Sequence, residues 1–560
     1  MNNFEAVIID GYVDEPACFG VPPYLSPYPR YIAGALHECN IEKQNIHYTT
    51  IDQLRKSSSM KETIKQADTV IIIAGMTVPG KYLRASPITL NEIESVFKIT
   101  SGSKILGGPI RLGFSKQGGE SAKKLGINVK DVYIAKEDIE AFVYDFLQNN
   151  QQIGNIIHRQ RTVEEIGRWA INGAFIHKQH PDHPHIICEL ETYRGCGRYT
   201  HCSFCTEPFY KESKYRPVDD IISEVSELYN SGARYFRIGR QPDLFTYQSI
   251  ENTSDISEPN PEAIEKLYRG IRDEAPDLQV LHMDNVNPAT IARYPDKSRK
   301  ILDIILKYHT PGDVCALGME SADPDVVSAN NLKATPEEVF EAIKIINEKG
   351  GKRGYNGLPE ILPGLNFVYG LKGETKKTFK NNYDFLIKIL DSGLLVRRIN
   401  LRQVVTFPGT PIYGKDTITK KHNKLFLNHK EKVREHIDKP MLRKLVPEGT
   451  ILKNVLCEVH KDGFTFGRQL GSYPLLVGIP ELLPENKFID IVVTGHGNRS
   501  ITGIPYPLRI NEASLELISE IPGIGKNQAA EIYKYIPFKD ENDFMKRVEY
   551  GEKLINYISL

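Results

Sequence analysis

Along the first 150 residues, apolar runs of strand length alternate with stretches whose apolar positions recur at helical spacing. The runs cover residues 6–9, 69–74, 104–106 and 132–134. Helical stretches such as residues 29–38 and 90–97 separate them, and glycines follow the runs, as at Gly11 and Gly107. This alternation predicts an open α/β domain over residues 1–150. The carboxyl ends of its parallel strands are where a ligand crevice is expected.

A longer alternation of the same kind covers residues 180–415. The expected strands lie near residues 186–190, 235–239, 280–283, 314–318, 365–368 and 398–404. Helical patterns such as residues 221–229 and 336–348 stand between them. Six strand and helix repeats predict a partial (β/α)6 barrel, in which functional side chains follow the strand ends.

The pattern changes after residue 415. Residues 416–445 form a basic linker, because the stretch from Lys415 to Lys444 holds ten Lys/Arg against four acidic residues. It is either a solvated connecting helix or a stripe that faces phosphates. Residues 446–510 carry short, Gly-punctuated apolar runs, which predict a small β-barrel of the OB type.

The last stretch, residues 511–560, carries a helix-hairpin-helix pattern around Pro522-Gly523-Ile524-Gly525-Lys526. Gly523 and Gly525 would let the turn approach a phosphate, and Lys526 would assist the exposed amides of the following helix. Such a hairpin binds backbone and does not read bases. A protein-interaction role remains an alternative.

Composition narrows the classes of function. A chain of 560 residues is too long for one core, so several domains are expected. Lys+Arg and Asp+Glu number 71 each, so only local charge can indicate a polyanionic partner. No apolar run approaches about 18 residues and no signal peptide precedes the first domain, so we expect a cytoplasmic protein without a membrane partner. Eight cysteines without regular pairing indicate reduced thiols and metal ligands.

Three of these cysteines, Cys196, Cys202 and Cys205, fall within ten residues, directly after the first predicted barrel strand. Crowded thiolates repel one another unless a metal centre takes up their charge. Three ligands leave one metal position open, as in a reactive centre. With His201 added, the same residues could instead form a closed Cys3His zinc site.

The cysteine loop resembles that of the radical S-adenosylmethionine (SAM) superfamily. The last pair reads Cys-x-x-Cys with an aromatic residue, Phe204, before the final ligand. Five residues separate Cys196 from Cys202, where superfamily members usually have three. The resemblance implies a [4Fe-4S] cluster that chelates SAM, a 5'-deoxyadenosyl radical, and an electron donor such as ferredoxin or flavodoxin.

The resemblance also implies cofactor-binding residues at the other strand ends. SAM needs donors for its carboxylate, and acceptors for its amino group and ribose hydroxyls. The segment after the second strand corresponds to the one that binds the SAM amino group, and the Glu-Ser after the fourth corresponds to the one for ribose or carboxylate. Together with Phe204, the candidates are Gly239, Arg240, Gln241, Asp284, Asn285, Glu320, Ser321, Pro408 and Gly409.

The N-terminal domain resembles the Rossmann-like modules of cobalamin-binding radical methylases and of tRNA methylthiotransferases. The Asp-x-His-x-x-Gly cobalamin signature is absent after the first strand, so cobalamin is only an alternative cofactor. Methylthiotransferases carry three N-terminal cysteines for a second cluster, and here only Cys18 and Cys39 are present. Cys18 is the one candidate for a catalytic thiol.

The C-terminal β-rich region looks like a divergent TRAM domain, the RNA-binding appendage of methylthiotransferases. Its expected nucleic-acid contacts are Arg468, Tyr473, His496 and Arg499. The whole layout looks like that of uncharacterised archaeal radical SAM proteins with a C-terminal helix-hairpin-helix.

These patterns predict a radical SAM enzyme that modifies an RNA nucleoside, with tRNA as the expected substrate. A cobalamin-type methylase that acts on a small molecule or protein is the first alternative. A zinc-bearing nucleic-acid-binding protein without catalysis is the second.

Overall fold

The apolar runs of the N-terminal domain form a parallel five-stranded sheet with the order β3-β1-β4-β5-β6. The computed structural model describes residues 4–12, 24–75, 85–115, 117–152, 156, 158–249, 255–549 and 551–560, so Cys18 lies outside the described residues. The strands are β1 (Ala6–Asp10), β3 (Ile46–Thr50), β4 (Thr69–Ile73), β5 (Ser103–Gly107) and β6 (Val132–Ile134). All but β3 coincide with predicted runs. The sequence of β3, Ile-His-Tyr-Thr-Thr, is too polar to read as a buried strand, although most of it is buried.

Helices cover both faces of this sheet. They are α1 (Pro27–Glu38), α2 (Ile51–Lys56), α3 (Ser58–Gln66), α4 (Leu90–Ile99) and α5 (Ile139–Gln148), followed by α6 (Val163–Asn172). Capping boxes open α4 and α6, at Thr89 with Glu92 and at Thr162 with Glu165.

The central part of the chain is a partial barrel made of two four-stranded sheets, β11-β10-β7-β2 and β12-β13-β14-β15. The strands are β2 (Tyr24–Leu25), β7 (Ile187–Glu191), β10 (Tyr235–Gly239), β11 (Val280–Met283), β12 (Asn285–Val286), β13 (Asp313–Glu320), β14 (Ile361–Tyr369) and β15 (Arg398–Gln403). The two sheets meet at Asp284, whose carbonyl accepts the Ala316 N–H at 3.2 Å. Every pairing within them is parallel, as the predicted barrel requires.

The outer layer of this barrel is helical. Its helices are α7 (Val218–Asn230), α8 (Pro261–Glu274), α9 (Pro288–Arg293), α10 (Pro295–Tyr308), α11 (Pro324–Ala329), α12 (Pro336–Gly350) and α13 (Lys376–Asp391). A short antiparallel pair, β8 (Tyr193–Arg194) and β9 (Lys214–Tyr215), frames the cysteine loop.

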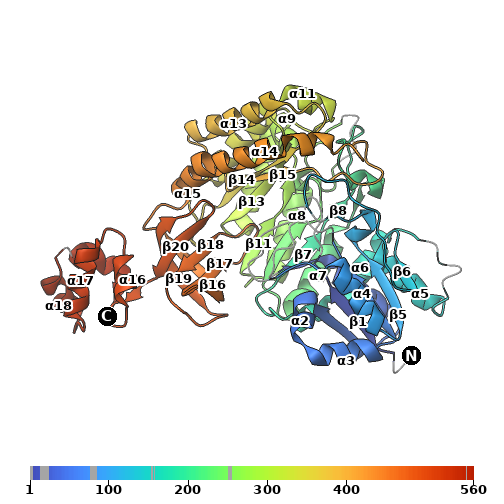
Figure 1. Ribbon diagram of the computed structural model, residues 1–560, viewed down its shortest axis with the longest axis horizontal. Helices are drawn as coiled ribbons and strands as arrows, with labels where there is room; N and C mark the ends of the chain where they lie inside the picture. Colours follow the sequence, from blue (N-terminus) through green and yellow to red (C-terminus); the bar gives the residue numbers. More distant parts are fainter. Residues whose placement is uncertain are drawn as a thin grey trace.

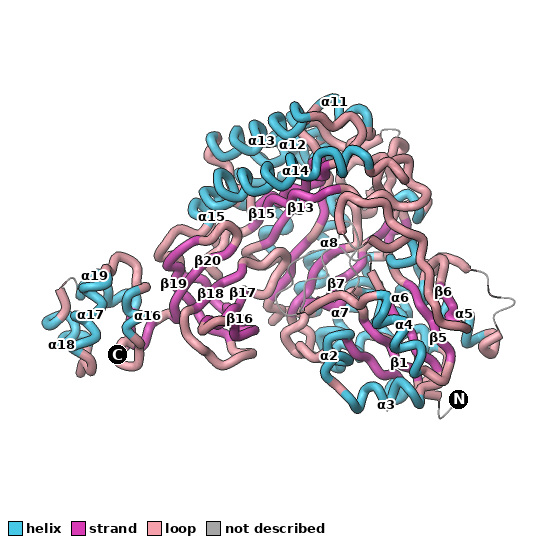
Figure 2. The backbone as a smooth tube through the Cα atoms, viewed as in Figure 1, coloured by secondary structure: helices cyan, strands magenta, loops and turns pink. Residues whose placement is uncertain are grey.

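The basic linker is helical along most of its length. It forms α14 (Thr417–Val433), the π-helical turn η7 (Arg434–Asp438) and α15 (Lys439–Leu445), and α14 runs beside α13 (Figure 2). Phe426, Val433 and Ile437 bury one side of it against the barrel helices. None of the described helices combines the length and apolar character that a membrane span needs.

The C-terminal region contains the predicted small barrel. Its strands are β16 (Ile451–Lys461), β17 (Phe464–Gln469), β18 (Leu476–Ile479), β19 (Phe488–His496) and β20 (Ser500–Pro505), and they close in the order β16-β17-β18-β20-β19. Beyond it lie β21 (Leu508–Arg509), α16 (Leu515–Ser519), α17 (Lys526–Tyr535), α18 (Glu541–Arg547), α19 (Gly551–Leu554) and β22 (Ile558–Ser559). These helices occupy the end of the molecule opposite the N-terminal domain (Figure 1). The mixed α/β fold class is thereby confirmed, and the helix-hairpin-helix remains a prediction.

The loop between β17 and β18 joins the small barrel to the central one. The Ser472 N–H donates to His282 Nδ1 at 2.9 Å, and the Tyr473 hydroxyl donates to Asp284 Oδ1 at 2.9 Å. Arg397 Nη2 donates to the Tyr473 carbonyl at 2.9 Å. The small barrel is therefore docked through buried polar contacts to strands of the central barrel.

Candidate functional site

One cavity of about 630 Å³ opens at the carboxyl ends of the central barrel strands. The three clustered cysteines line it, together with residues that follow β10, β12 and β13. A loop of the N-terminal domain, through Ser115 and Gln117, and one side of α14 complete its wall. This is the edge where parallel β/α structures place their ligands.

The cysteine loop begins at a glycine that no other residue could replace without strain. Gly195 has φ +91, and a Cβ there would lie 2.6 Å from the Glu212 carbonyl oxygen. Its N–H donates to Glu207 Oε2 at 3.0 Å. The chain can therefore turn sharply out of β8 and deliver Cys196 to the cavity.

Asp255 holds the additional residues between Cys196 and Cys202. Its Oδ1 accepts the N–H groups of Tyr199 at 2.9 Å and Thr200 at 3.1 Å, and its Oδ2 accepts Arg198 Nε at 3.0 Å. Arg198 Nη1 lies 3.5 Å from Cys202 Sγ. The longer loop is thus held by a carboxylate from a segment far along the chain, and it brings a positive charge to the second cysteine.

Burial raises the pKa of all three thiols, and it does so most for Cys205. Glu207 and then neighbouring cysteines raise the pKa of Cys196 and Cys205 further, and Glu320 raises that of Cys202, whereas Arg198 lowers the pKa of Cys196 and Cys202. Thiols that share one shielded cavity do not readily ionise without a compensating positive charge, which a metal centre provides.

The arrangement fits a cluster, because a cubane takes each thiolate on a different iron and so needs three thiols around one space. Within the described residues, no three His, Cys, Asp or Glu side chains converge on a single ion position. His201 also lines the cavity, so all four residues of the alternative zinc site lie in the same wall.

Five of the ten predicted cofactor contacts line this cavity: Phe204, Arg240, Gln241, Asn285 and Glu320. The residues after β10 and β11 are joined, since Asn285 Nδ2 donates to the Gln241 carbonyl at 3.4 Å. Arg240 has φ +64, and its Nη2 donates to the Tyr28 hydroxyl at 2.6 Å. Amide, guanidinium and carboxylate groups of the kinds that SAM requires therefore surround one space.

Glu320 is the carboxylate of this set, and it stands at the end of β13 with φ +62. Burial raises its pKa to about 7, against the opposing charges of Lys333 and Arg402. A carboxyl that titrates near neutrality can donate a hydrogen bond when protonated and accept one when ionised.

The other five predicted contacts do not line the cavity. Asp284 is buried in an ion pair with Arg237 Nη2 at 2.6 Å, and Ser321 Oγ accepts the Asp323 N–H at 3.1 Å. A Cβ at Gly239 would lie 2.3 Å from Glu189 Oε1, so this glycine allows close packing. Pro408 and Gly409 follow Phe407, which does line the cavity.

The sequence patterns missed Lys333, Arg402 and the loop of the N-terminal domain. Lys333 follows a helix with no motif around it, and Arg402 sits inside a predicted strand. The N-terminal loop pairs with the segment after β15, where Thr406 Oγ1 donates to Ser121 Oγ at 2.9 Å. Only alternating polar residues within β15 pointed to a side chain such as Arg402.

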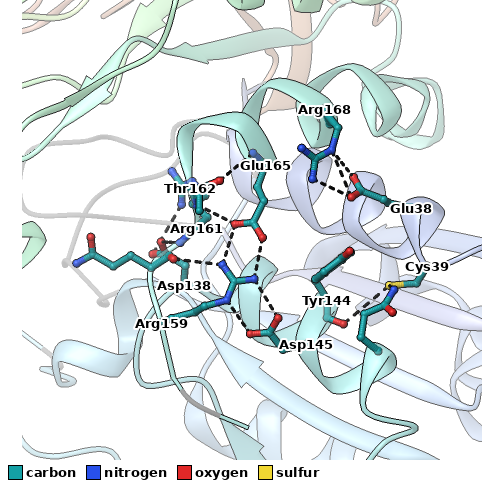
Figure 3. Close-up of polar contacts among 12 residues, drawn as sticks. Glu38, Cys39, Asp138, Tyr144, Asp145, Arg159, Arg161, Thr162, Glu165 and Arg168 are labelled. Carbon is teal, nitrogen blue, oxygen red and sulfur yellow. Dashed lines mark hydrogen bonds and ion pairs between the residues drawn. The ribbon is translucent and has the colours of Figure 1, made fainter.

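A buried ion network, also missed, positions the strand that leads into the cysteine loop. Arg194 donates to Asp138 at 2.7 Å, and Arg161 donates to Glu191 at 2.7 Å and to Glu140. At the edge of this network, Arg159 lies between Asp145 and Glu165, with Asp138 and Arg161 nearby (Figure 3). The N-terminal domain is thus clamped to β7 and β8, two residues before Cys196.

Most nucleic-acid contacts predicted on the small barrel are buried. Arg468 pairs with Glu458 at 2.6 Å, Tyr473 reaches Asp284, and His496 Nε2 contacts the Val446 carbonyl at 2.7 Å. Arg499 alone of these is exposed, in the turn between β19 and β20. Arg468 and Tyr473 therefore serve the interior of the molecule, because neither has the exposure that a phosphate contact needs.

The glycines of the predicted hairpin lie before α17. Gly523 has φ +86, and the Gly525 N–H donates to Gln528 Oε1 at 2.9 Å. Lys526 is the first residue of α17 and is exposed. The three residues lie together at the start of one helix.

Comparison with known proteins adds the following relatives. The Radical SAM superfamily model matches residues 190–386. An uncharacterized protein of Methanocaldococcus jannaschii is 48% identical over 507 residues, which is 89% of this chain and 92% of the relative. An uncharacterized protein of Archaeoglobus fulgidus is 44% identical over 520 residues, 93% of each chain.

Two more distant similarities, one to a curated protein and one to a solved structure, describe those proteins and not this chain. The tRNA-2-methylthio-N(6)-dimethylallyladenosine synthase of Thermotoga petrophila is 23% identical over 293 residues, 49% of this chain and 56% of the relative. A radical S-adenosylmethionine methyltransferase from Kitasatospora setae, solved with cobalamin and a [4Fe-4S] cluster, has a TM-score of 0.47 at 12% identity over 74% of this chain and 77% of that one.

Proposed function

We propose, because the chain belongs to the radical SAM superfamily, that it uses radical chemistry to modify an RNA nucleoside, with tRNA as the substrate. Membership of this family makes the chain an enzyme and implies a [4Fe-4S] cluster and SAM as its cofactors. When bound, the reduced cluster and SAM supply a 5'-deoxyadenosyl radical. Cys196, Cys202 and Cys205 would hold the cluster. The observation that carries the proposal is that these thiols and five SAM-type contacts line one cavity.

The polar residues of the cavity would bind and orient SAM. Arg240 and Gln241 would bind the amino-acid end, and Glu320 and Asn285 would bind the ribose. Phe204, Leu401 and Phe407 present apolar surface on the same cavity. Apolar walls exclude water, which would otherwise quench a radical intermediate and weaken each polar contact.

RNA as the substrate is supported by two observations. The Thermotoga petrophila relative is named as a tRNA-modifying synthase, and it aligns over 49% of this chain. The cavity wall also carries the cations Lys333, Arg402 and Lys430. A ferredoxin or flavodoxin is the electron donor that we propose.

The test is made on anaerobically purified protein. Iron and acid-labile sulfide should both be present, and dithionite with SAM should release 5'-deoxyadenosine. The C205A variant should lose both, and the C39A variant, which removes a cysteine outside the cavity, should keep both. Zinc in place of iron, or no 5'-deoxyadenosine, would refute the enzymatic proposal.

The RNA part is tested separately. Mass spectrometry of tRNA nucleosides from a deletion strain should show one modified nucleoside missing, and its return on complementation. An unchanged nucleoside profile would reject tRNA while leaving the radical chemistry standing.

A cobalamin-type methylase is the second candidate, because the N-terminal domain contributes Ser115 and Gln117 to the cavity wall. A second cofactor at the carboxyl edge of that sheet would then face the cluster. The test is the visible absorbance of protein reconstituted with hydroxocobalamin and passed through a desalting column. Full loss of the cobalamin would remove this candidate.

A further inference from the structure

The face of α14 that lines the cavity carries basic residues at its C-terminal end. Asn423, Phe426, Leu427 and Lys430 line the cavity at helical spacing, so they form one face of the helix. The next position on that face is Arg434, at the start of η7. The two basic residues therefore continue the cavity wall toward the small barrel.

Strand β15 adds two arginines on one of its faces. Arg398 and Arg402 are four residues apart, and side chains at even spacing in a strand share a face. Arg402 lines the cavity, and its charge lowers the pKa of Glu320. Arg398 Nε donates to Asn400 Oδ1 at 2.7 Å, and its guanidinium lies 5.0 Å from the Tyr473 ring centre.

The exposed turn between β19 and β20 brings Arg499 to the same region. After burial, the charge of Arg499 is the largest influence that lowers the pKa of Arg398, to about 9. Burial and then the charges of Arg434 and Arg499 lower the pKa of Lys430. Elements far apart in the sequence thus place their cations within range of one another.

The charge of Asp438 acts on Arg499 and raises its pKa, against the effect of burial. Burial raises the pKa of Asp438 to about 6, although Arg499 and Arg434 oppose this. Besides burial, the charges of Arg499 and Arg402 lower the pKa of Arg398, and the charges of Arg434 and Arg499 lower the pKa of Lys430, so these cations lie close enough to oppose one another. The group therefore repels itself, and an external anion would relieve that repulsion.

We propose that Arg398, Arg402, Lys430, Arg434 and Arg499 form a basic track along which the phosphates of the RNA substrate lie, from the β19–β20 turn to the cavity. This inference rests on the proposed function, whose substrate class it places on the molecule. Phosphate contacts of this kind set position and register and carry no base specificity. The nucleoside next to the phosphate held by Lys430 and Arg402 would be the one that enters the cavity.

The track also explains why composition did not reveal a polyanionic partner. The total charge is balanced, at 71 residues of each sign, but the cations of the track are gathered by folding from β15, α14, η7 and the β19–β20 turn. On the opposite side of α14, Lys421 and Lys424 are exposed and do not line the cavity.

The test compares two double variants of the full chain in filter binding with bulk tRNA over a salt series. R434A/R499A removes two cations of the track, and K421A/K424A removes two cations from the outer side of the same helix. The track variant should bind roughly 10-fold more weakly and lose about 0.7–0.9 of salt slope for each phosphate contact removed. The K421A/K424A control should bind as the wild type does. Thermal midpoints and iron content check that both variants are folded.

The possible outcomes distinguish a failure of the basic track from a failure of the proposed function. If R434A/R499A binds tRNA like the wild type while K526A loses binding, the RNA lies on the C-terminal hairpin and the track is wrong, but the proposed function stands. Equal losses in R434A/R499A and K421A/K424A would show unspecific charge attraction and also overturn the track. If the wild type releases 5'-deoxyadenosine but binds no tRNA at low salt, RNA fails as the substrate, and the track falls with it.

Discussion

Asp10, the last residue of β1, is a buried carboxyl whose ionisation is opposed by its surroundings. It is 2% exposed, and it accepts the Tyr12 N–H at 2.8 Å and the Tyr48 hydroxyl at 3.0 Å. Burial outweighs these hydrogen bonds and raises its pKa to about 6. The pKa is therefore higher in the folded state than in the unfolded chain, so ionisation of Asp10 opposes folding as the pH rises through 6.

The D10N variant should consequently be more stable than the wild type at alkaline pH. At pH 8 the gain is about 2–3 kcal/mol in the free energy of unfolding, because the amide carries no charge to desolvate. At pH 4 the wild-type carboxyl is already protonated in the folded state, and the gain should nearly vanish. Thermal midpoints at the two pH values measure this, with D52N, at a partly exposed position, as control. A stabilisation that is the same at both pH values would contradict the account.

At the scale of elements, the cysteine loop depends on partners outside itself. Its backbone N–H groups at Tyr199 and Thr200 bond to Asp255, and the Ser203 N–H bonds to the Asn330 carbonyl at 3.0 Å. The loop has little regular structure of its own, so these contacts limit where its thiols can lie. Ordering from outside of this kind lowers the entropic cost of binding a cluster.

The D255A variant should fold normally but retain its cluster poorly. Loss of three hydrogen bonds to the loop frees Arg198, Tyr199 and Thr200 and should increase the rate of iron loss several-fold. Iron per chain after timed exposure to a chelator, under anaerobic conditions, measures it. The matched control is E258A, which removes a nearby surface acid paired with Lys297. Equal iron loss in the two variants would show that Asp255 does not order the loop.

The ion network around Arg194 affects the stability of the fold, because its members are buried. Removing Asp138 leaves the Arg194 guanidinium without its bidentate partner in a shielded site. The D138A variant should therefore lose about 3–5 kcal/mol of stability. The partly exposed pair of Asp52 and Arg55 provides the control, since D52A should cost no more than about 1 kcal/mol. Unfolding in denaturant compares the two, and similar small losses would mean that the network adds little to stability.

At the scale of the whole molecule, the small barrel and the central barrel behave as one body through the β17–β18 loop. Ser472 and Tyr473 bond to His282 and Asp284, and the latter directly precedes Asn285 in the cavity wall. A displacement of the small barrel would therefore shift the strand that carries Asn285, a proposed cofactor contact.

The G471A variant tests this docking. A Cβ at Gly471 would lie 2.7 Å from His282 Cε1, so the loop has to withdraw from the barrel. Calorimetry should then show an earlier, separate transition for the small barrel, whereas the wild type should unfold it together with the central barrel. G126A is the control, since a Cβ there meets nothing within 4 Å. A single transition in G471A at the wild-type temperature would show that the loop contributes nothing to docking.

Much of the fold could be predicted because burial imposes a period on the sequence. Six of the eight strands of the central barrel appeared as apolar runs. The strands of the N-terminal sheet did so except β3, whose buried residues include Thr49 and Thr50. Half of the predicted cofactor contacts line the cavity. The other half fall where the chain turns, because a motif gives the position along a strand end but not the direction of the side chain.

What the sequence by itself determined is local: where strands and helices form, that three cysteines share one loop, and that the chain belongs to the radical SAM superfamily. The elements and the shared loop follow from hydrophobic periodicity and from residue spacing within a few turns of chain, and the superfamily follows from resemblance to known sequences over residues 190–386. Only the tertiary structure decided that Asp255 holds the loop, that Arg468 and Tyr473 are buried, and that five cations from β15, α14, η7 and the β19–β20 turn gather beside the cavity. Those outcomes depend on contacts between residues tens to hundreds of positions apart, and no local pattern carries that information.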